Sequence, residues 1–168
     1  ISTDNGQTWR ASTSTTPATG SAVSTTVLLG HTVAVTQSVT IDSAVFDGQV
    51  TISSGQTLTI ANAPGTDLTV AGTILNQGTF SVNTGGTWSL KSGGTFIHNS
   101  SSGISTALNA AAISASSTFE YRDSGTPSLG GRTYGDLKLA TASSKSYTNS
   151  ASSGSLTVGG RLEIGKGV

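Results

Sequence analysis

Residues 72–97 read GTILNQGTFSVNTGGTWSLKSGGTFI, and this stretch decides the fold. Its glycines Gly78, Gly86 and Gly94 lie eight residues apart, and each is followed by a threonine and a short alternation of apolar and polar residues. A period of two buries one face of a strand and exposes the other, and glycine permits the bend that separates two strands. The stretch therefore predicts short strands joined at glycine corners.

Related units stand on both sides of this stretch. The clearest copies are Gly30–Val35, Gly55–Ile60, Gly154–Val158 and Gly160–Ile164. Self-similarity at a nearly fixed spacing is typical of a solenoid, and about three sides of this size make a coil of roughly 20–25 residues. We expect an all-β fold, a parallel β-helix (β-solenoid) over residues 25–168, preceded by an irregular N-terminal segment at residues 1–24. Short strands with glycine turns also suit a β-sandwich, which stays as the alternative.

No segment shows helical spacing between a start and a stop signal. Residues 107–115 are rich in alanine, but Asn109 and Ser114 interrupt them. We therefore expect no helix.

The composition restricts the function classes. Only 10% of the 168 residues are charged, against about 25% in an ordinary domain, so threonine and serine hydroxyls must supply much of the polar surface, in ladders on the outer faces. The chain contains no cysteine and no methionine, which excludes disulfides, thiolate metal sites and a cysteine nucleophile. Eight basic residues balance eight acidic ones, so we expect no nucleic-acid partner. The chain contains no run of about 18 apolar residues, so we expect no membrane insertion.

The charges are unevenly distributed along the chain. Residues 1–84 carry one basic and four acidic residues, a net charge of −3, and residues 85–168 carry seven basic and four acidic residues, a net charge of +3. The last repeat, at Leu162–Ile164, lacks a polar cap, and an uncapped coil offers unpaired strand edges. We therefore expect self-association or continuation of the same solenoid in a longer chain, and head-to-tail contact would build an open filament.

Several motifs point to a protein family. The chain contains Gly30–Val35 (GHTVAV), Val70–Phe80 (VAGTILNQGTF), Gly94–Asn99 (GTFIHN) and Tyr134–Leu139 (YGDLKL). These motifs resemble the glycine- and threonine-rich β-helical regions of large surface proteins that Bacteroidetes and their relatives export by the type IX secretion route. Asp136 stands where that pattern usually has asparagine.

The resemblance implies an extracellular, cell-surface scaffold or adhesin, usually part of a far longer polypeptide. It also implies O-glycosylation at Asp-Ser/Thr-apolar triplets, for which Asp42-Ser43-Ala44 makes Ser43 the candidate acceptor. We therefore expect a structural or adhesive module that is not an enzyme and needs no cofactor.

Three features of the sequence are candidate sites of chemistry. Residues 2–9 (STDNGQTW) match the Asp-box of sialidase-like propellers, but a single copy favours a simple β-turn. His31 and His98 are the only histidines. Neither has a second ligand at metal spacing, so we expect both at the surface or at a corner and no metal site. Glu120, Arg122 and Asp123 form the tightest charged group, which we interpret as an exposed pair on one strand face rather than as catalytic residues.

The alternative function is a carbohydrate-binding or polysaccharide-degrading β-helix. Sugar binding needs an aromatic platform, for which Trp88 and Tyr134 are the candidates. Trp88 also aligns with Phe80 and Phe96 at eight-residue spacing, which favours a place in the core. Ice-binding solenoids carry long files of threonine, but Thr57 with Thr59 stands as an isolated pair in the sequence.

Overall fold

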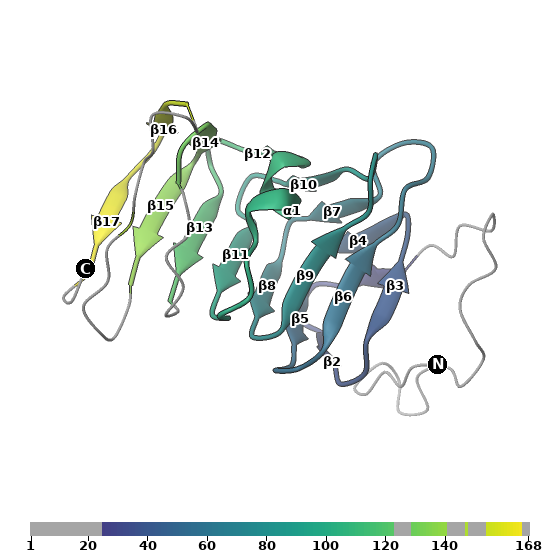
Figure 1. The fold of residues 1–168 in the computed structure, drawn as a ribbon. Coiled ribbons are helices and arrows are strands. Elements are labelled where there is room, and N and C mark those ends of the chain that lie inside the picture. The colour runs from purple at the N-terminus through teal and green to yellow at the C-terminus, as the bar shows by residue number, and fades with distance from the viewer. Residues whose placement is uncertain (1–24, 123–128, 141–146, 148–153, 166–168) are drawn as a thin grey trace.

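The chain winds as a β-solenoid of about five turns (Figure 1). The computed structural model describes residues 25–122, 129–140, 147 and 154–165. Within these residues each strand pairs in parallel with strands of the neighbouring coils. The predicted parallel β-helix is confirmed and the β-sandwich is excluded, because the paired neighbours do not run antiparallel. The segment 1–24, with the Asp-box motif at residues 2–9, lies outside the described residues, as does Asp123.

The strands form three sheets along the solenoid. Sheet 1 consists of β1 (Thr26–Val27), β4 (Ala44–Phe46), β7 (Leu68–Val70), β10 (Trp88–Leu90) and β12 (Ala111–Ile113). Sheet 2 consists of β2 (Thr32–Val35), β5 (Gln49–Ile52), β8 (Thr73–Asn76), β11 (Thr95–His98), β13 (Thr118–Tyr121), β15 (Asp136–Leu139) and β17 (Leu162–Ile164). Sheet 3 consists of β3 (Val39–Ile41), β6 (Thr57–Ile60) and β9 (Thr79–Val82). A further pair is formed by β14 (Arg132–Tyr134) and β16 (Leu156–Val158).

The eight-residue glycine spacing corresponds to one side of a coil. Gly78 precedes β9, Gly86 precedes β10 and Gly94 precedes β11, and these three strands belong to three different sheets. Along sheet 2 the coil length runs from 17 residues, between the paired Val33 and Val50, to 25 residues, between the paired Leu137 and Leu162. The shortest of these coils therefore falls below the expected 20–25 residues.

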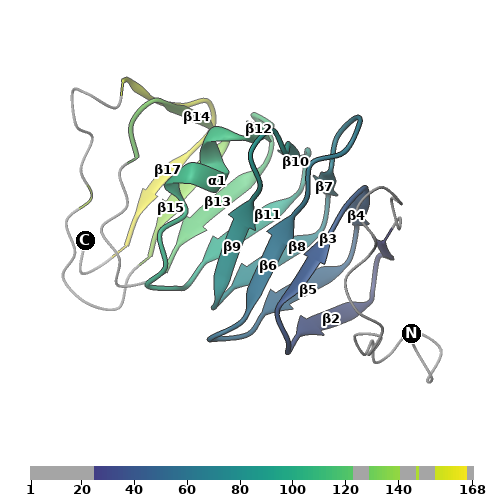
Figure 2. The ribbon, with the colours of Figure 1, turned by 45° about the vertical axis from the view of Figure 1, so that its right-hand side comes forward.

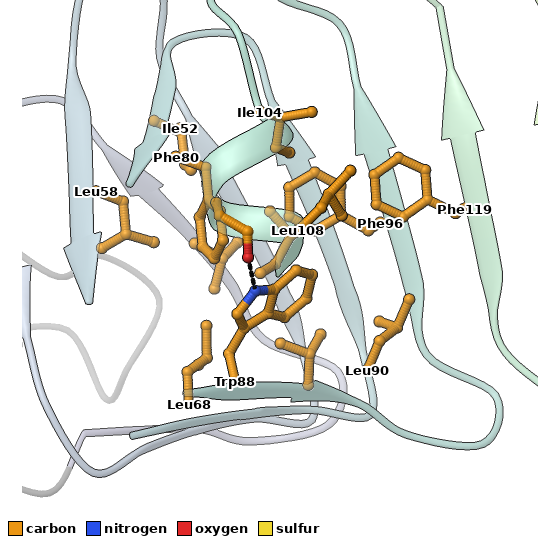
Figure 3. Close-up of a cluster of buried hydrophobic side chains, with 14 of the residues drawn as sticks. Ile52, Leu58, Leu68, Phe80, Trp88, Leu90, Phe96, Ile104, Leu108 and Phe119 are labelled. Carbon is orange, nitrogen blue, oxygen red and sulfur yellow. Dashed lines mark hydrogen bonds between the residues drawn. The ribbon is translucent and has the colours of Figure 1, made fainter. Parts of the chain in front are cut away.

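Inward side chains stack on their equivalents one coil away and form a continuous core (Figure 3). In sheet 2 one inward file runs in register through Val50, Ile74, Phe96, Phe119 and Leu137, all of them buried. Rings fill the middle of the core, with centroids 5.2 Å apart for Phe80 and Phe96 and 5.0 Å apart for Phe96 and Phe119, distances at which aromatic pairs attract. The predicted stacking of inward apolar residues is confirmed.

One helix interrupts the strand pattern, and the expectation of none was wrong. The helix α1 (Ser105–Asn109) contacts β9 at the end of sheet 3, where the next coil would otherwise place a strand (Figure 2). The N-cap residue Ile104 and the helical residues Ala107 and Leu108 are buried and follow helical spacing. No side chain caps the start of the helix. Packing therefore stabilises this single turn, which explains why capping signals in the sequence did not reveal it. In the described part of the chain no helix is long and apolar enough to cross a membrane.

Candidate functional site

The two aromatic residues considered as sugar platforms lie in the core. Trp88 is 1% exposed, packs against Phe80 with ring centroids 5.1 Å apart, and donates a hydrogen bond from Nε1 to Ala107 O at 2.8 Å (Figure 3). Tyr134 is fully buried, with its hydroxyl 3.4 Å from that of Tyr121. Neither ring offers a face to a ligand, so the predicted glycan contacts were wrong, and the core interpretation of Trp88 is confirmed.

Burial also governs the ionisation of the two tyrosines. Desolvation raises the pKa of Tyr134, and it raises the pKa of Tyr121 well above its ordinary value, an effect to which Tyr134 adds. Both phenols therefore stay protonated and serve as packed core groups.

The two histidines occupy different environments. His31 lies half-buried at the corner before β2, as expected, with Nδ1 3.3 Å from Leu29 O. His98 is only 4% exposed, so its expected surface position was wrong. As the last residue of β11 it faces the same side as Phe96, next to Asn76 and Tyr121 on the adjacent strands. The amide of Asn76 donates from Nδ2 to His98 Nδ1 at 3.2 Å. His98 is therefore a hydrogen-bonded core residue.

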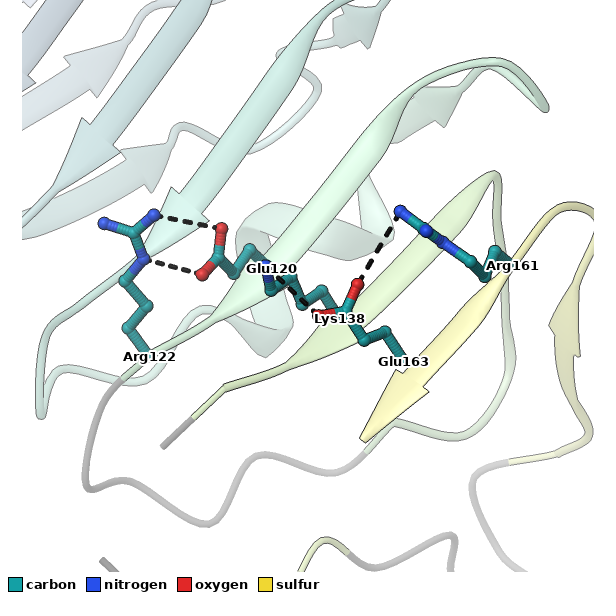
Figure 4. A network of polar contacts seen from close by, with 5 residues as sticks. All are labelled: Glu120, Arg122, Lys138, Arg161 and Glu163. Carbon is teal, nitrogen blue, oxygen red and sulfur yellow. Dashed lines mark hydrogen bonds and ion pairs between the residues drawn. The ribbon is translucent and has the colours of Figure 1, made fainter. Parts of the chain in front are cut away.

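A charged ladder lies on the outer face of sheet 2 (Figure 4). Register places Glu120 beside Lys138 and Lys138 beside Glu163 on three successive strands. Arg122 holds Glu120 with two contacts, 2.6 Å from Nε to Oε1 and 3.2 Å from Nη2 to Oε2. Glu163 lies 3.3 Å from Lys138 Nζ and 3.6 Å from Arg161 Nη2.

In this charged ladder the basic side chains neutralise the glutamates. Glu120 is buried while Arg122 stays partly exposed, so the expected exposed pair is only half correct. The hydrogen bond that the Arg122 guanidinium donates to Glu120 raises the pKa of Arg122. A glycosidase needs two carboxylates that face each other across a substrate, whereas Lys138 separates the two glutamates here. Within the described residues no three His, Cys, Asp or Glu side chains gather as a metal site would require.

Two other aspartates hold corners between coils. Asp67 is buried and accepts hydrogen bonds from Ala63 N and Thr87 N, both at 2.7 Å. Asp136 accepts from Arg161 N at 2.7 Å. Both carboxylates satisfy backbone donors that the corner leaves unpaired, so they are structural.

Ser43 lies at the corner between β3 and β4. Its φ of 51° falls in the left-handed region that non-glycine residues seldom occupy. The serine is half-buried and the following Ala44 is buried. Its O-glycosylation stays a prediction.

Hydroxyl ladders, which the composition predicted, line the outer face of sheet 3. Register aligns Thr40, Thr59 and Ser81 in one file. In the second file Thr57 N donates to Ser38 Oγ at 3.0 Å, and the hydroxyls of Thr79 and Ser102 lie 3.1 Å apart. Thr57 and Thr59 are therefore not an isolated pair, a fact that the sequence reveals only once the coils are aligned.

The ends of the solenoid carry the exposed apolar residues. Among the described residues, the large apolar side chains that are exposed are Leu28, Leu29, Leu162 and Ile164, at 59%, 83%, 48% and 60%. The first two belong to the corner after β1, and the last two belong to β17. Leu162 and Ile164 pair with Leu137 and Leu139, which are 0% and 5% exposed one coil earlier. They thus point in the inward direction but have no coil beyond them among the described residues.

Comparisons of the chain with protein-family models, with curated proteins and with solved structures find no match.

Proposed function

We propose that the chain is a structural module of an extracellular surface protein, a polar rod that makes its contacts through its ends. The observation that carries this proposal is the position of the exposed large apolar side chains, at the first and last described coils and not on the lateral faces. Lateral hydroxyl ladders and a neutralised charged ladder suit a surface that faces water. Bare strand edges with apolar residues suit pairing with further strands.

The charge distribution supports contact between opposite ends. The charged residues between positions 25 and 84 are Asp42, Asp47 and Asp67, all acidic. The basic side chains of the described residues lie beyond them, together with the acidic Glu120, Asp136 and Glu163. Arg161 stands at the last strand, largely exposed. Unlike charges at the two ends attract each other, and salt weakens this attraction.

Secretion and a place on the cell surface belong to the proposal. Their support is the motif resemblance, with Ser43 as the candidate site of O-glycosylation. A non-catalytic role is proposed because each glutamate of the charged ladder is neutralised by a basic neighbour.

The experiment measures particle length by negative-stain electron microscopy over a range of concentrations, at low and high salt. We expect particles to lengthen with concentration and to shorten in high salt. The variant Leu162→Lys/Ile164→Lys should abolish the lengthening, because lysine on an edge strand blocks pairing. The matched control is Leu75→Lys/Ile97→Lys, which changes the same residue types on the outer face of sheet 2. Particles of single-solenoid length at every concentration, or equal effects of both variants, would refute contact through the ends.

A further inference from the structure

We infer that the group that covers the last described coil is the first coil of a second copy of this chain, with β2 of that copy paired in parallel beside β17. The inference rests on the proposed function and adds to it the partner and the register. It makes sheet 2 continuous from one molecule to the next.

The register follows from the pairing inside one molecule. β2 pairs with β5 so that Val33 lies beside Val50 and Val35 beside Ile52, which places Val33 and Val35 in the two inward files of sheet 2. Leu162 and Ile164 stand in the same two files at the other end. Val33 beside Leu162 and Val35 beside Ile164 would therefore extend both files through the junction. A shift by one residue would turn these apolar side chains to the outer face.

The outer face accepts the same register. Ala34 would lie beside Glu163, and its methyl group leaves the contact of Glu163 with Lys138 undisturbed. Thr32 would lie beside Arg161. Neither position brings like charges together, which would oppose pairing.

The proposed contact also places two corners beside each other. The corner that joins β1 to β2 contains Leu28 and Leu29, and the corner between β16 and β17 contains Gly159 and Gly160. Such a contact joins two different surfaces and, repeated, produces an open fibre.

Cysteine cross-linking tests the register directly, because the natural sequence contains no cysteine. Neighbouring strands place paired Cα atoms about 4.8 Å apart, within the range of about 4.4–6.8 Å that a disulfide spans. The test variant is Ala34→Cys/Glu163→Cys. Its two cysteines lie on the opposite edge strands of sheet 2 and cannot meet within one molecule (Figure 1). The control is Ala34→Cys/Lys138→Cys, whose second cysteine lies one strand further from the junction, about 9.6 Å from Ala34 of the next copy.

Under mild oxidation we expect the test variant to lose most of its monomer to a ladder of dimers, trimers and longer species, which reductant reverses. The control should stay monomeric on the same denaturing gel. If particles lengthen in electron micrographs but the test variant gives no ladder, or both variants give equal ladders, the register is overturned while the contact through the ends stands. If neither variant lengthens or cross-links at any concentration, a second copy is not the partner and the proposed end-to-end contact fails with it.

Discussion

Replacing Gly72 with alanine places a methyl group between two stacked coils. Gly72 lies at the corner between β7 and β8, directly beside the corner of the preceding coil. An added Cβ would overlap Gly48 O and would lie 2.5 Å from Asp47 O and 2.6 Å from Asp47 C. These are backbone atoms that cannot rotate away, and real Cβ atoms essentially never approach another atom closer than 3.0 Å.

The coils must therefore separate at this corner, and the separation affects two hydrogen bonds. Gly72 N donates to Phe46 O at 2.8 Å, and Thr73 N donates to Gly48 O at 3.0 Å. Leaving both partly unmade costs about 1–3 kcal/mol each. The reduced freedom of the unfolded chain returns about 0.4–1 kcal/mol. We expect Gly72→Ala to lower the free energy of unfolding by about 2–5 kcal/mol.

Two control substitutions separate space from backbone conformation. Gly103→Ala meets no atom within 4 Å and has no left-handed backbone angle, so it should be neutral or slightly stabilising. Gly55→Ala also meets open space, but its φ of 76° should cost about 1–2 kcal/mol. Urea unfolding followed by far-UV circular dichroism measures all three variants. If Gly72→Ala unfolds within about 0.5 kcal/mol of Gly103→Ala, the coils are not stacked this closely and the reasoning is wrong.

Three further substitutions test the interior, each by the same unfolding measurement. Asp67→Ala should cost about 2–4 kcal/mol, because Thr87 N and a second backbone donor lose their acceptor; a loss below about 0.5 kcal/mol would contradict this role. Trp88→Phe should cost about 2–4 kcal/mol through a cavity and an unpaired Ala107 carbonyl, and an unchanged midpoint would argue against core burial. The raised pKa of Tyr121 means that the folded state holds its proton more tightly than the unfolded chain. The contribution of Tyr121 to stability should therefore be constant below about pH 10 and be lost above it, so that stability falls less steeply there in Tyr121→Phe. Identical pH profiles of the two proteins above about pH 10 would refute this effect.

The architecture was predictable because each repeat contains the residues that form its own strand and corner. Gly55–Ile60 contains a glycine, a threonine and an alternation, and the structure places Thr57–Ile60 in β6. Such local signals repeat along the chain, so even weak individual motifs add up to a solenoid.

Contacts between coils were harder to predict. The position of His98 depends on where β11 ends. The strand includes His98 as its last residue, so the alternation of the strand turns the imidazole into the core. The file that aligns Thr40 with Thr59 becomes visible only when the pairing of coils of unequal length is known. The helix α1 is stabilised by packing rather than by caps. The sequence also does not distinguish the exposed Leu162 from the buried Leu137, whereas the structure does.

The sheets differ in how far they continue along the solenoid, and this difference determines where the sequence can vary. Sheet 2 passes without interruption through seven strands, whereas α1 takes the place of a strand beside β9 (Figure 2). Length changes and foreign elements are thus tolerated on one side while the opposite side keeps its alignment. A short peptide epitope spliced in before α1, near Gly103, should be displayed at a fixed height along the axis, which makes that side the natural place for sequence variation and for engineering.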